Sequence, residues 1–147
     1  VVVLDVPVVR AVYGKIPALG ALDAMATRRG IKETSFTAVG YGLQKSFPDA
    51  ASWQTQSDRV RMLATPQLLQ INVPGFTGDY SVLLSNNVNT GGTCFGDSGG
   101  PNFIGDSNVI GGVTSFGING NCAGTGGVFR LYTKNAQDWL ATFGIFP

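Results

Sequence analysis

Short apolar runs separated by glycine-rich or polar turns make up most of this chain from Ser35 onwards. Between residues 59 and 64 the pattern alternates, with Val60 and Met62 on one face and two arginines on the other, as in a half-buried strand. The same criteria predict strands at residues 35–39, 59–64, 68–73, 80–84, 102–104, 109–116 and 127–131. Short strands with turn residues between them indicate an all-β chain.

The N-terminal part of the chain has a different pattern. Residues 1–4 are a β-branched run that predicts a buried strand, and Pro7 should end it because proline donates no ladder hydrogen bond. Residues 10–33 resemble a connecting segment with a short helix at 19–28, which two glycines weaken. The chain has no starting Met and no signal-peptide pattern, so it reads like a strand already in progress.

The C-terminal end has helical spacing. Ala136, Leu140 and Phe143 recur at intervals of four and three residues, which predicts a helix at 134–143 with one apolar face. Thr133 precedes this segment, and a threonine side chain there is a suitable N-cap.

Composition bounds the possible functions. The 147 residues are 44% hydrophobic and 13% charged, which predicts one folded domain with a core rather than a disordered chain. The net charge is +1, and the densest basic spots, Arg28-Arg29 and Arg59 with Arg61, are read as solvated surface, so no nucleic-acid partner is expected. No apolar run reaches the length of a membrane-spanning helix. No metal-ligand spacing, phosphate loop or cofactor motif occurs, so neither cofactor nor metal is expected.

Residues 96–101 read Gly-Asp-Ser-Gly-Gly-Pro and carry the clearest candidate chemistry. A serine hydroxyl is a weak nucleophile until a base takes its proton, and the oxyanion it creates needs preorganised donors. Glycines permit a tight turn around Ser98, so the amide N–H groups of Gly96 and Ser98 are expected to converge on one point. Asp97 would then point inward and need a partner for its charge. The chain contains no histidine to act as the base.

A glycine-rich hairpin without chemistry is the alternative interpretation of this stretch. Average residue usage gives the six-residue string a chance frequency of roughly one in ten million per position, which weakens that alternative.

The stretch Cys-Phe-Gly-Asp-Ser-Gly-Gly-Pro at 94–101 resembles the nucleophile loop of the chymotrypsin-like (trypsin-family) serine proteases. Further segments resemble the same family: Gly40-Tyr41-Gly42, Ser115-Phe116-Gly117, Gly126-Gly127-Val128-Phe129 and the C-terminal helix with Trp139. The resemblance implies the second six-stranded antiparallel Greek-key barrel of a two-barrel fold, plus a C-terminal helix. Residues 1–4, followed by Asp5, resemble the strand after the family's catalytic aspartate, and Asp5 itself is read as a surface acid.

The resemblance also implies a domain organisation. Residues 1–9 would be the last strand region of a missing first barrel, 10–34 the linker, 35–133 the C-terminal barrel, and 134–147 the helix and tail. The family's catalytic histidine and aspartate lie in the first barrel, so the chain is expected to be a fragment that is inactive alone. Its expected partners are a peptide or protein substrate and the missing N-terminal barrel.

The family's roles carry over to specific residues. Ser98 would be the nucleophile, the N–H groups of Gly96 and Ser98 the oxyanion hole, and Asp97 the residue that orders this loop by pairing with an amine. Cys94 and Cys122 match a family disulfide that joins the two walls of the primary pocket. A disulfide suits an exported protein, so a secreted, extracellular location is expected.

The expected substrate-binding residues are Gly92, Thr93, Ser115, Phe116, Gly117 and Gly127. In the family, the residue at the position of Gly92 lies at the base of the primary pocket, and trypsin-like enzymes have a carboxylate there. Without it a basic substrate side chain would be buried unpaired, so trypsin-like cleavage is not expected. Gly117 and Gly127 take the wall positions, which predicts a deep uncharged pocket for a large apolar or aromatic side chain.

Two classes of function follow from these residues. The first is a serine endopeptidase, of which this chain carries the nucleophile, oxyanion hole and primary pocket. The second is a catalytically dead protease homologue that uses the old cleft as a binding module. The intact Gly-Asp-Ser-Gly-Gly-Pro stretch favours the first, because a dead homologue has no need of the serine. An unrelated β-barrel with a coincidental loop is a third interpretation.

Overall fold

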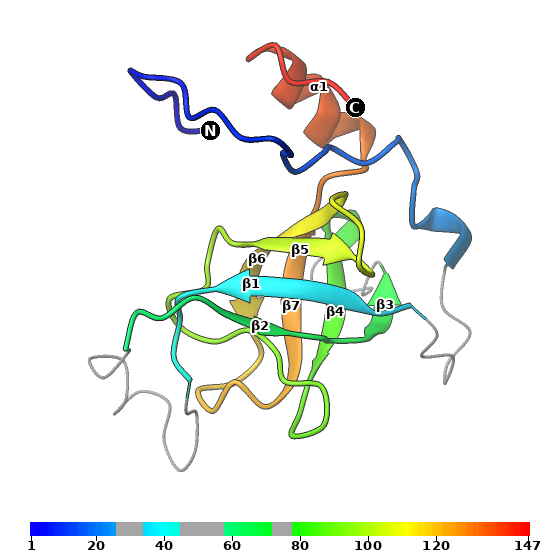
Figure 1. Ribbon diagram of the computed structural model, residues 1–147. Helices are drawn as coiled ribbons and strands as arrows, with labels where there is room; N and C mark the ends of the chain where they lie inside the picture. Colours follow the sequence, from blue (N-terminus) through cyan, green and yellow to red (C-terminus); the bar gives the residue numbers. More distant parts are fainter. Residues whose placement is uncertain (26–33, 45–57, 72–77) are drawn as a thin grey trace.

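The computed structural model (Figure 1) describes residues 1–25, 34–44, 58–71 and 78–147. The strands are β1 (Phe36–Gly40), β2 (Met62–Ala64), β3 (Leu68–Ile71), β4 (Ser81–Asn86), β5 (Pro101–Ile104), β6 (Ile110–Gly117) and β7 (Gly124–Arg130). One helix, α1 (Lys134–Ala141), follows them, and short 3-10 turns occur at Asp23–Met25 and Gly78–Tyr80. Each predicted strand from residue 35 onwards is present with small shifts at its ends, except the one predicted at 59–64. There only Met62–Ala64 form a strand, and Val60 and Met62 are each 52% exposed instead of forming a half-buried face. Residues 72–73 of another prediction lie outside the described residues.

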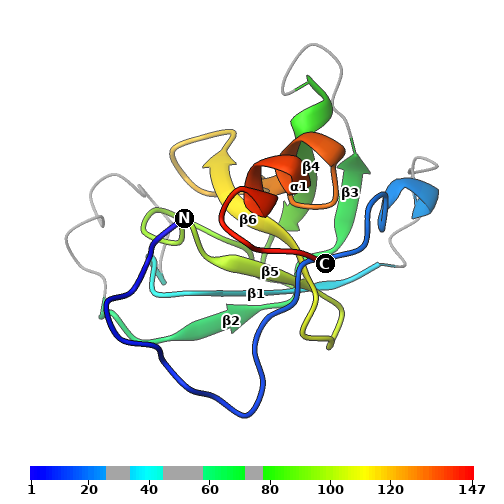
Figure 2. The same cartoon turned by 90° about the horizontal axis from the view of Figure 1, so that it is seen from above.

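The strands form one antiparallel sheet in the order β2-β1-β5-β6-β7-β4-β3. The two outermost strands, β2 and β3, are consecutive in the chain with only residues 65–67 between them. At this bend the Pro66 carbonyl accepts a hydrogen bond from Phe36 N–H, and the Gln67 carbonyl accepts one from Ser85 N–H, each at 2.8 Å. One bent segment therefore borders both β1 and β4 and curls the sheet, as Figure 2 shows from above. Because β2 and β3 together take the place of one strand, the predicted six-stranded Greek-key barrel is confirmed.

A cluster of buried side chains fills the curled sheet. Its members are Leu22, Phe36, Leu68, Val82, Leu84, Val128 and Tyr132. Five of them lie on strands, whereas Leu22 and Tyr132 lie outside the sheet and pack onto it. Full burial of a side chain of this kind contributes about 1.5–3 kcal/mol, so the cluster makes a stable frame for the loops.

Arg130 at the end of β7 ties two distant segments to this frame. Its guanidinium pairs with the Asp23 carboxylate at 2.5 Å and donates to the Asp79 carbonyl at 2.9 Å. It also lies over the Tyr132 ring, 4.4 Å from the ring centroid. Burial raises the pKa of Tyr132 to about 12, an effect that the positive charge of Arg130 partly offsets.

The N-terminal segment differs from the prediction, because residues 1–4 form no strand. Val2 and Val3 are 84% and 82% exposed, and the segment lies outside the barrel (Figure 1). A β-branched run has strand propensity, but a strand also needs a hydrogen-bonded neighbour. Within the described residues no strand pairs with this segment.

The connecting segment becomes attached to the barrel further along. Lys15 N–H donates to the Asn108 carbonyl at 2.8 Å, and Gly20 N–H donates to the Tyr132 carbonyl at 2.9 Å. The predicted helix at 19–28 is wrong where it is described: Gly20 has a φ of +72°, which a right-handed helix does not accept. Only the 3-10 turn at Asp23–Met25 forms, and residues 26–28 lie outside the described part.

The C-terminal helix is confirmed with its cap. The Thr133 side chain accepts a hydrogen bond from Ala136 N–H at 3.3 Å, and α1 buries Ala136 and Leu140. The helix ends at Ala141, two residues before the predicted end, and Gly144 follows with a φ of +73°. In the described part of the chain, no helix is long and apolar enough to cross a membrane.

Candidate active site

The candidate loop consists of two successive turns that share Asp97. Asp97 N–H donates to the Cys94 carbonyl at 3.1 Å, and Gly100 N–H donates to the Asp97 carbonyl at 2.9 Å. The third residue of each turn is a glycine with positive φ, +95° at Gly96 and +86° at Gly99, as type II turns require. Residues with a Cβ are strained there, so two glycines of the motif are explained by backbone conformation alone.

Strong backbone contacts hold the loop against the barrel. Gly99 N–H donates to the Thr114 carbonyl, and Thr114 N–H donates to the Gly100 carbonyl, each at 2.9 Å. A Cβ on Gly100 would lie 2.7 Å from the Val39 carbonyl oxygen, so only glycine permits this approach. The loop is thereby fixed between β1 and β6.

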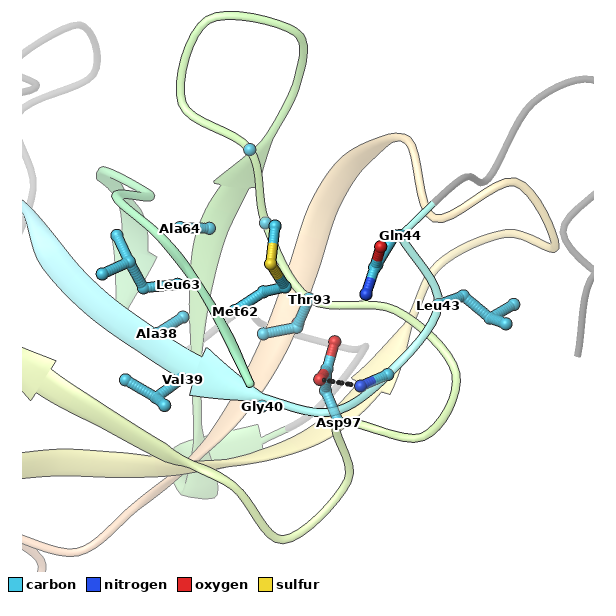
Figure 3. Close-up of a pocket in the computed structure, with 13 residues that line it drawn as sticks. Ala38, Val39, Gly40, Leu43, Gln44, Met62, Leu63, Ala64, Thr93 and Asp97 are labelled. Atoms are coloured by element: carbon cyan, nitrogen blue, oxygen red, sulfur yellow. Dashed lines mark hydrogen bonds between the residues drawn. The ribbon is translucent and has the colours of Figure 1, made fainter. Parts of the chain in front are cut away.

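The Asp97 side chain points inward from the shared corner of the two turns. Its carboxylate accepts a hydrogen bond from Gly42 N–H at 2.7 Å (Figure 3). It accepts another from Cys94 N–H at 2.9 Å. A Cβ on Gly42 would lie 2.5 Å from the carboxylate carbon, and one on Gly40 would overlap its oxygen. The Gly-Tyr-Gly stretch at the end of β1 therefore makes room for the carboxylate, and backbone amides supply the partners that its charge needs.

A cavity of about 170 Å³ opens beside this carboxylate. It is lined by the end of β1, residues 42–44, β2, residues 91–93 and Asp97 (Figure 3). Gly92, predicted at the base of the primary pocket, lines this cavity and not the hollow beside Ser98. The space that a side chain on Gly92 would take is occupied by Asn86, whose amide donates to the Thr93 carbonyl at 2.7 Å.

Ser98 lies at the exposed corner of the second turn. Among the described residues its hydroxyl has no hydrogen-bond partner, and the N–H groups of Gly96 and Ser98 likewise make no bond to a described carbonyl. Two backbone donors next to a hydroxyl are the components needed to bind an oxyanion formed at that hydroxyl. What the chain does not provide is a histidine base.

A hollow of about 130 Å³ lies next to Ser98. Its lining residues are Thr93, Cys94, Phe95, Ser98, Thr114, Ser115, Phe116, Gly117, Asn119 and Cys122, none of which is charged. The structure thus brings four of the predicted substrate-binding residues together with Ser98: Thr93, Ser115, Phe116 and Gly117. Gly127 lies behind them on β7, where a Cβ would overlap the Phe116 ring. The slot that Gly127 was expected to leave open is therefore filled by this ring.

The wall of the hollow is stapled by the predicted disulfide, which is confirmed between Cys94 and Cys122 with a Cα–Cα distance of 5.3 Å. Sequence reasoning missed Asn119 in the same wall. Its amide donates to the Ala123 carbonyl at 2.8 Å, and its carbonyl oxygen accepts from the N–H groups of Asn121 and Ala123, each at 3.1 Å. The Asn-Gly pair at 119–120 was the available signal, since asparagine side chains commonly organise turns.

This chain is similar to known proteins in sequence and in fold. The family model described as Trypsin matches residues 22–140. The HL collagenase structure has a TM-score of 0.62 at 20% sequence identity, covering 88% of this chain and 53% of that chain. A mutant of human heparin binding protein has a TM-score of 0.59 at 20% identity, covering 87% of this chain and 48% of that chain. Comparison with curated protein sequences gives no match.

The similarity to these solved structures is a similarity of fold. At 20% identity the solved structures show a shared fold and no more. This chain also spans only about half the length of each of them.

Proposed function

This chain belongs to the trypsin family, and from that premise we propose that it carries the nucleophile of a serine endopeptidase. The observation behind the proposal is the double turn at 94–100, which leaves the Ser98 hydroxyl and two neighbouring amide N–H groups without partners among the described residues. A glycine-rich hairpin that only joined two strands would have no reason to keep all three groups available.

The reaction follows from these positions. The Ser98 oxygen attacks the carbonyl carbon of a peptide bond, and a histidine from elsewhere in the protein takes the hydroxyl proton. The carbonyl oxygen becomes an oxyanion, bound by the N–H groups of Gly96 and Ser98. When the tetrahedral intermediate collapses, the amine leaves with that proton, and an acyl group remains on Ser98 until water hydrolyses it. Asp97 contributes by holding the loop through its two amide contacts.

Substrate binding uses the hollow next to Ser98. The backbone at Ser115–Gly117 would pair with the substrate backbone, and the uncharged hollow would take one apolar side chain. No lining residue carries a charge to neutralise lysine or arginine, so basic side chains are disfavoured.

The histidine and aspartate of the triad would come from a second barrel of the same protein. Two features support this part of the proposal. The related solved chains are about twice as long, and apolar side chains are exposed along the N-terminal segment and β2, including Val2 at 84% and Leu63 at 67%. Exposed apolar surface of this extent is a common sign of a binding partner. The 147-residue chain alone is then inactive, and the protein acts outside the cell.

A binding module is the second candidate, and the observation that favours it is the absence of histidine from the chain. The two candidates differ in the reactivity of Ser98. In the endopeptidase a base activates this serine, whereas in a binding module it stays an ordinary alcohol.

Labelling of Ser98 tests the proposal. The coding sequence upstream of Val1 is read, and the longer protein is treated with a fluorophosphonate, which modifies only activated serines. We expect a histidine and an aspartate upstream and a single labelled peptide that contains Ser98. Ser98→Ala should abolish labelling, while the matched control Ser107→Ala should keep it. A folded longer protein that lacks either residue, or that is not labelled, refutes the endopeptidase and leaves the binding module.

A further inference from the structure

The ring of Phe116 occupies the space directly in front of Gly127. A Cβ built on Gly127 would overlap three atoms of this ring, Cζ, Cε1 and Cε2. The backbone of Gly127 itself has no positive φ and is paired with Leu83 on one side and Phe116 on the other. An ordinary strand position accepts any residue, so what this site requires of residue 127 is room for the ring.

An irregularity in the sheet puts the ring there. Along the β6–β7 pair, Thr114 is opposite Val128 and Phe116 is opposite Gly127, so Ser115 is an extra residue in β6. An extra residue of this kind re-aims the side chains that follow it. Without the irregularity, Ser115 would stand opposite Gly127.

The ring also limits the size of the hollow. What remains beside Ser98 is about 130 Å³. A cavity of about 150 Å³ holds one benzene molecule, so the remaining space suits a branched aliphatic group and is too small for a two-ring indole.

We propose that Phe116 is the residue that determines substrate size at this site, by filling the slot over Gly127. The primary pocket then accepts aliphatic side chains of about the size of valine or leucine and excludes large aromatic ones, contrary to the expectation from the glycines alone. The claim about peptide substrates rests on the proposed endopeptidase function, whereas the claim about the shape of the cleft does not.

Indole binding to the 147-residue chain tests the proposal without any chemistry at Ser98. Amide NMR spectra are recorded during titration with indole, and the signals of Ser98, Gly117 and Asn119 report on the hollow. We expect Phe116→Ala to bind indole roughly 10- to 100-fold more tightly than the unmodified chain, because the slot becomes available. Equal indole affinity of the two proteins, including no binding by either, overturns the proposal.

Two further variants make the result specific. Phe116→Ala combined with Gly127→Val should return the indole affinity to the unmodified value, because the valine refills the slot. If the double variant binds indole as Phe116→Ala does, the ring does not act by filling this space and the proposal fails. Phe129→Ala, which removes a partly exposed ring from the same pair of strands, is the matched control and should leave indole binding unchanged.

Folding of each variant is checked by circular dichroism. If Phe116→Ala does not fold, Phe116→Val replaces it with the same expected direction and the same overturning result. If the fluorophosphonate experiment fails while indole binding follows Phe116, the endopeptidase is refuted and the size restriction stands for a binding cleft.

Discussion

The tripeptide Gly-Asp-Ser occurs twice in this chain, at 96–98 and at 105–107, and its side chains make different contacts in the two places. In the first copy the Asp97 carboxylate turns inward onto two backbone amides, and the Ser98 hydroxyl has no partner among the described residues. In the second copy Asp106 is exposed, and the Ser107 hydroxyl donates to the Ile104 carbonyl at 2.7 Å and accepts from Val109 N–H at 3.1 Å.

The residues that follow each copy explain the difference. Gly99 and Gly100 allow a second turn immediately after the first, which carries Ser98 out to a corner. After the second copy, Asn108 and Val109 lead directly into β6, so the serine is used to close an ordinary hairpin. The Ser98 hydroxyl therefore stays available because backbone hydrogen bonds close both turns around it, whereas the Ser107 hydroxyl is itself used to close a turn.

The largest expected effect is the difference in kcat/KM between alanine variants of the two serines. In the longer protein, Ser98→Ala should lower kcat/KM for a peptide substrate by about 10⁴-fold or more, because the nucleophile is lost. Ser107→Ala, which touches only the hairpin, should change kcat/KM by no more than about twofold. Steady-state kinetics with both variants measures this. Comparable losses of kcat/KM for the two variants would show that the structural difference between the two loops has no consequence for catalysis.

The disulfide supports only the first copy, since Cys94 starts that loop. Replacing Cys94 and Cys122 together by serine should lower the free energy of unfolding by about 3–4 kcal/mol, because the bridge closes a 28-residue span. Urea unfolding gives the total, and amide hydrogen exchange should show faster opening at 94–100 than at 105–109. Faster exchange at both loops would mean that the bridge acts on the whole barrel.

The aspartates of the two copies should differ in their effect on the free energy of unfolding, by less than the disulfide contributes. Asp97→Asn replaces one accepting oxygen with a donor that faces an amide N–H, so we expect it to lower the free energy of unfolding by about 2–3 kcal/mol. Asp106→Asn changes an exposed side chain and should stay within about 0.5 kcal/mol. Urea unfolding of both variants checks the pair. An equal effect would mean that the amide contacts of Asp97 contribute little to stability.

The smallest expected effect is the same for both copies. Gly99 and Gly105 have φ values of +86° and +54°, and a Cβ on either would meet nothing within 4 Å. Alanine at each position should therefore cost only backbone strain, about 1 kcal/mol. Only Gly99→Ala should also slow fluorophosphonate labelling of Ser98 in the longer protein. If Gly105→Ala slows the labelling equally, the two loops are mechanically coupled.

Local signals in the sequence predicted the strands and the helix cap well. Alternation and turn residues identified the strands that have buried positions, such as β1 and β4, whereas β2 has no buried residue and covers only the second half of its predicted range. Thr133 precedes an apolar helical stripe. Residues 1–4 show the limit of such signals, because their strand propensity has no partner in the described chain. The helix expected at 19–28 failed because Gly20 takes a left-handed conformation that composition alone does not specify.

In the candidate site, too, some features could be predicted from the sequence and others could not. The disulfide was expected only from the family resemblance, and the structure contains it. Two features of the pocket were beyond the sequence because each depends on contacts between strands. Phe116 reaches Gly127 through a register shift in β6, and Asn86 fills the space beside Gly92 from the end of β4. A glycine in a sequence indicates room, and only the fold shows which side chain uses it.

The bend at Pro66 also has a consequence for self-association. The bend at Pro66 joins β2, which pairs with β1, to β3, which pairs with β4. The two outermost strands of the sheet are therefore only three and four residues long, and a buried proline separates them. Such short, bent borders are poor templates for another chain to extend, which protects the barrel from edge-to-edge aggregation. The exposed apolar run at residues 1–4 precedes Pro7 and pairs with no described strand, so it is open to pairing with a neighbouring molecule in a concentrated solution.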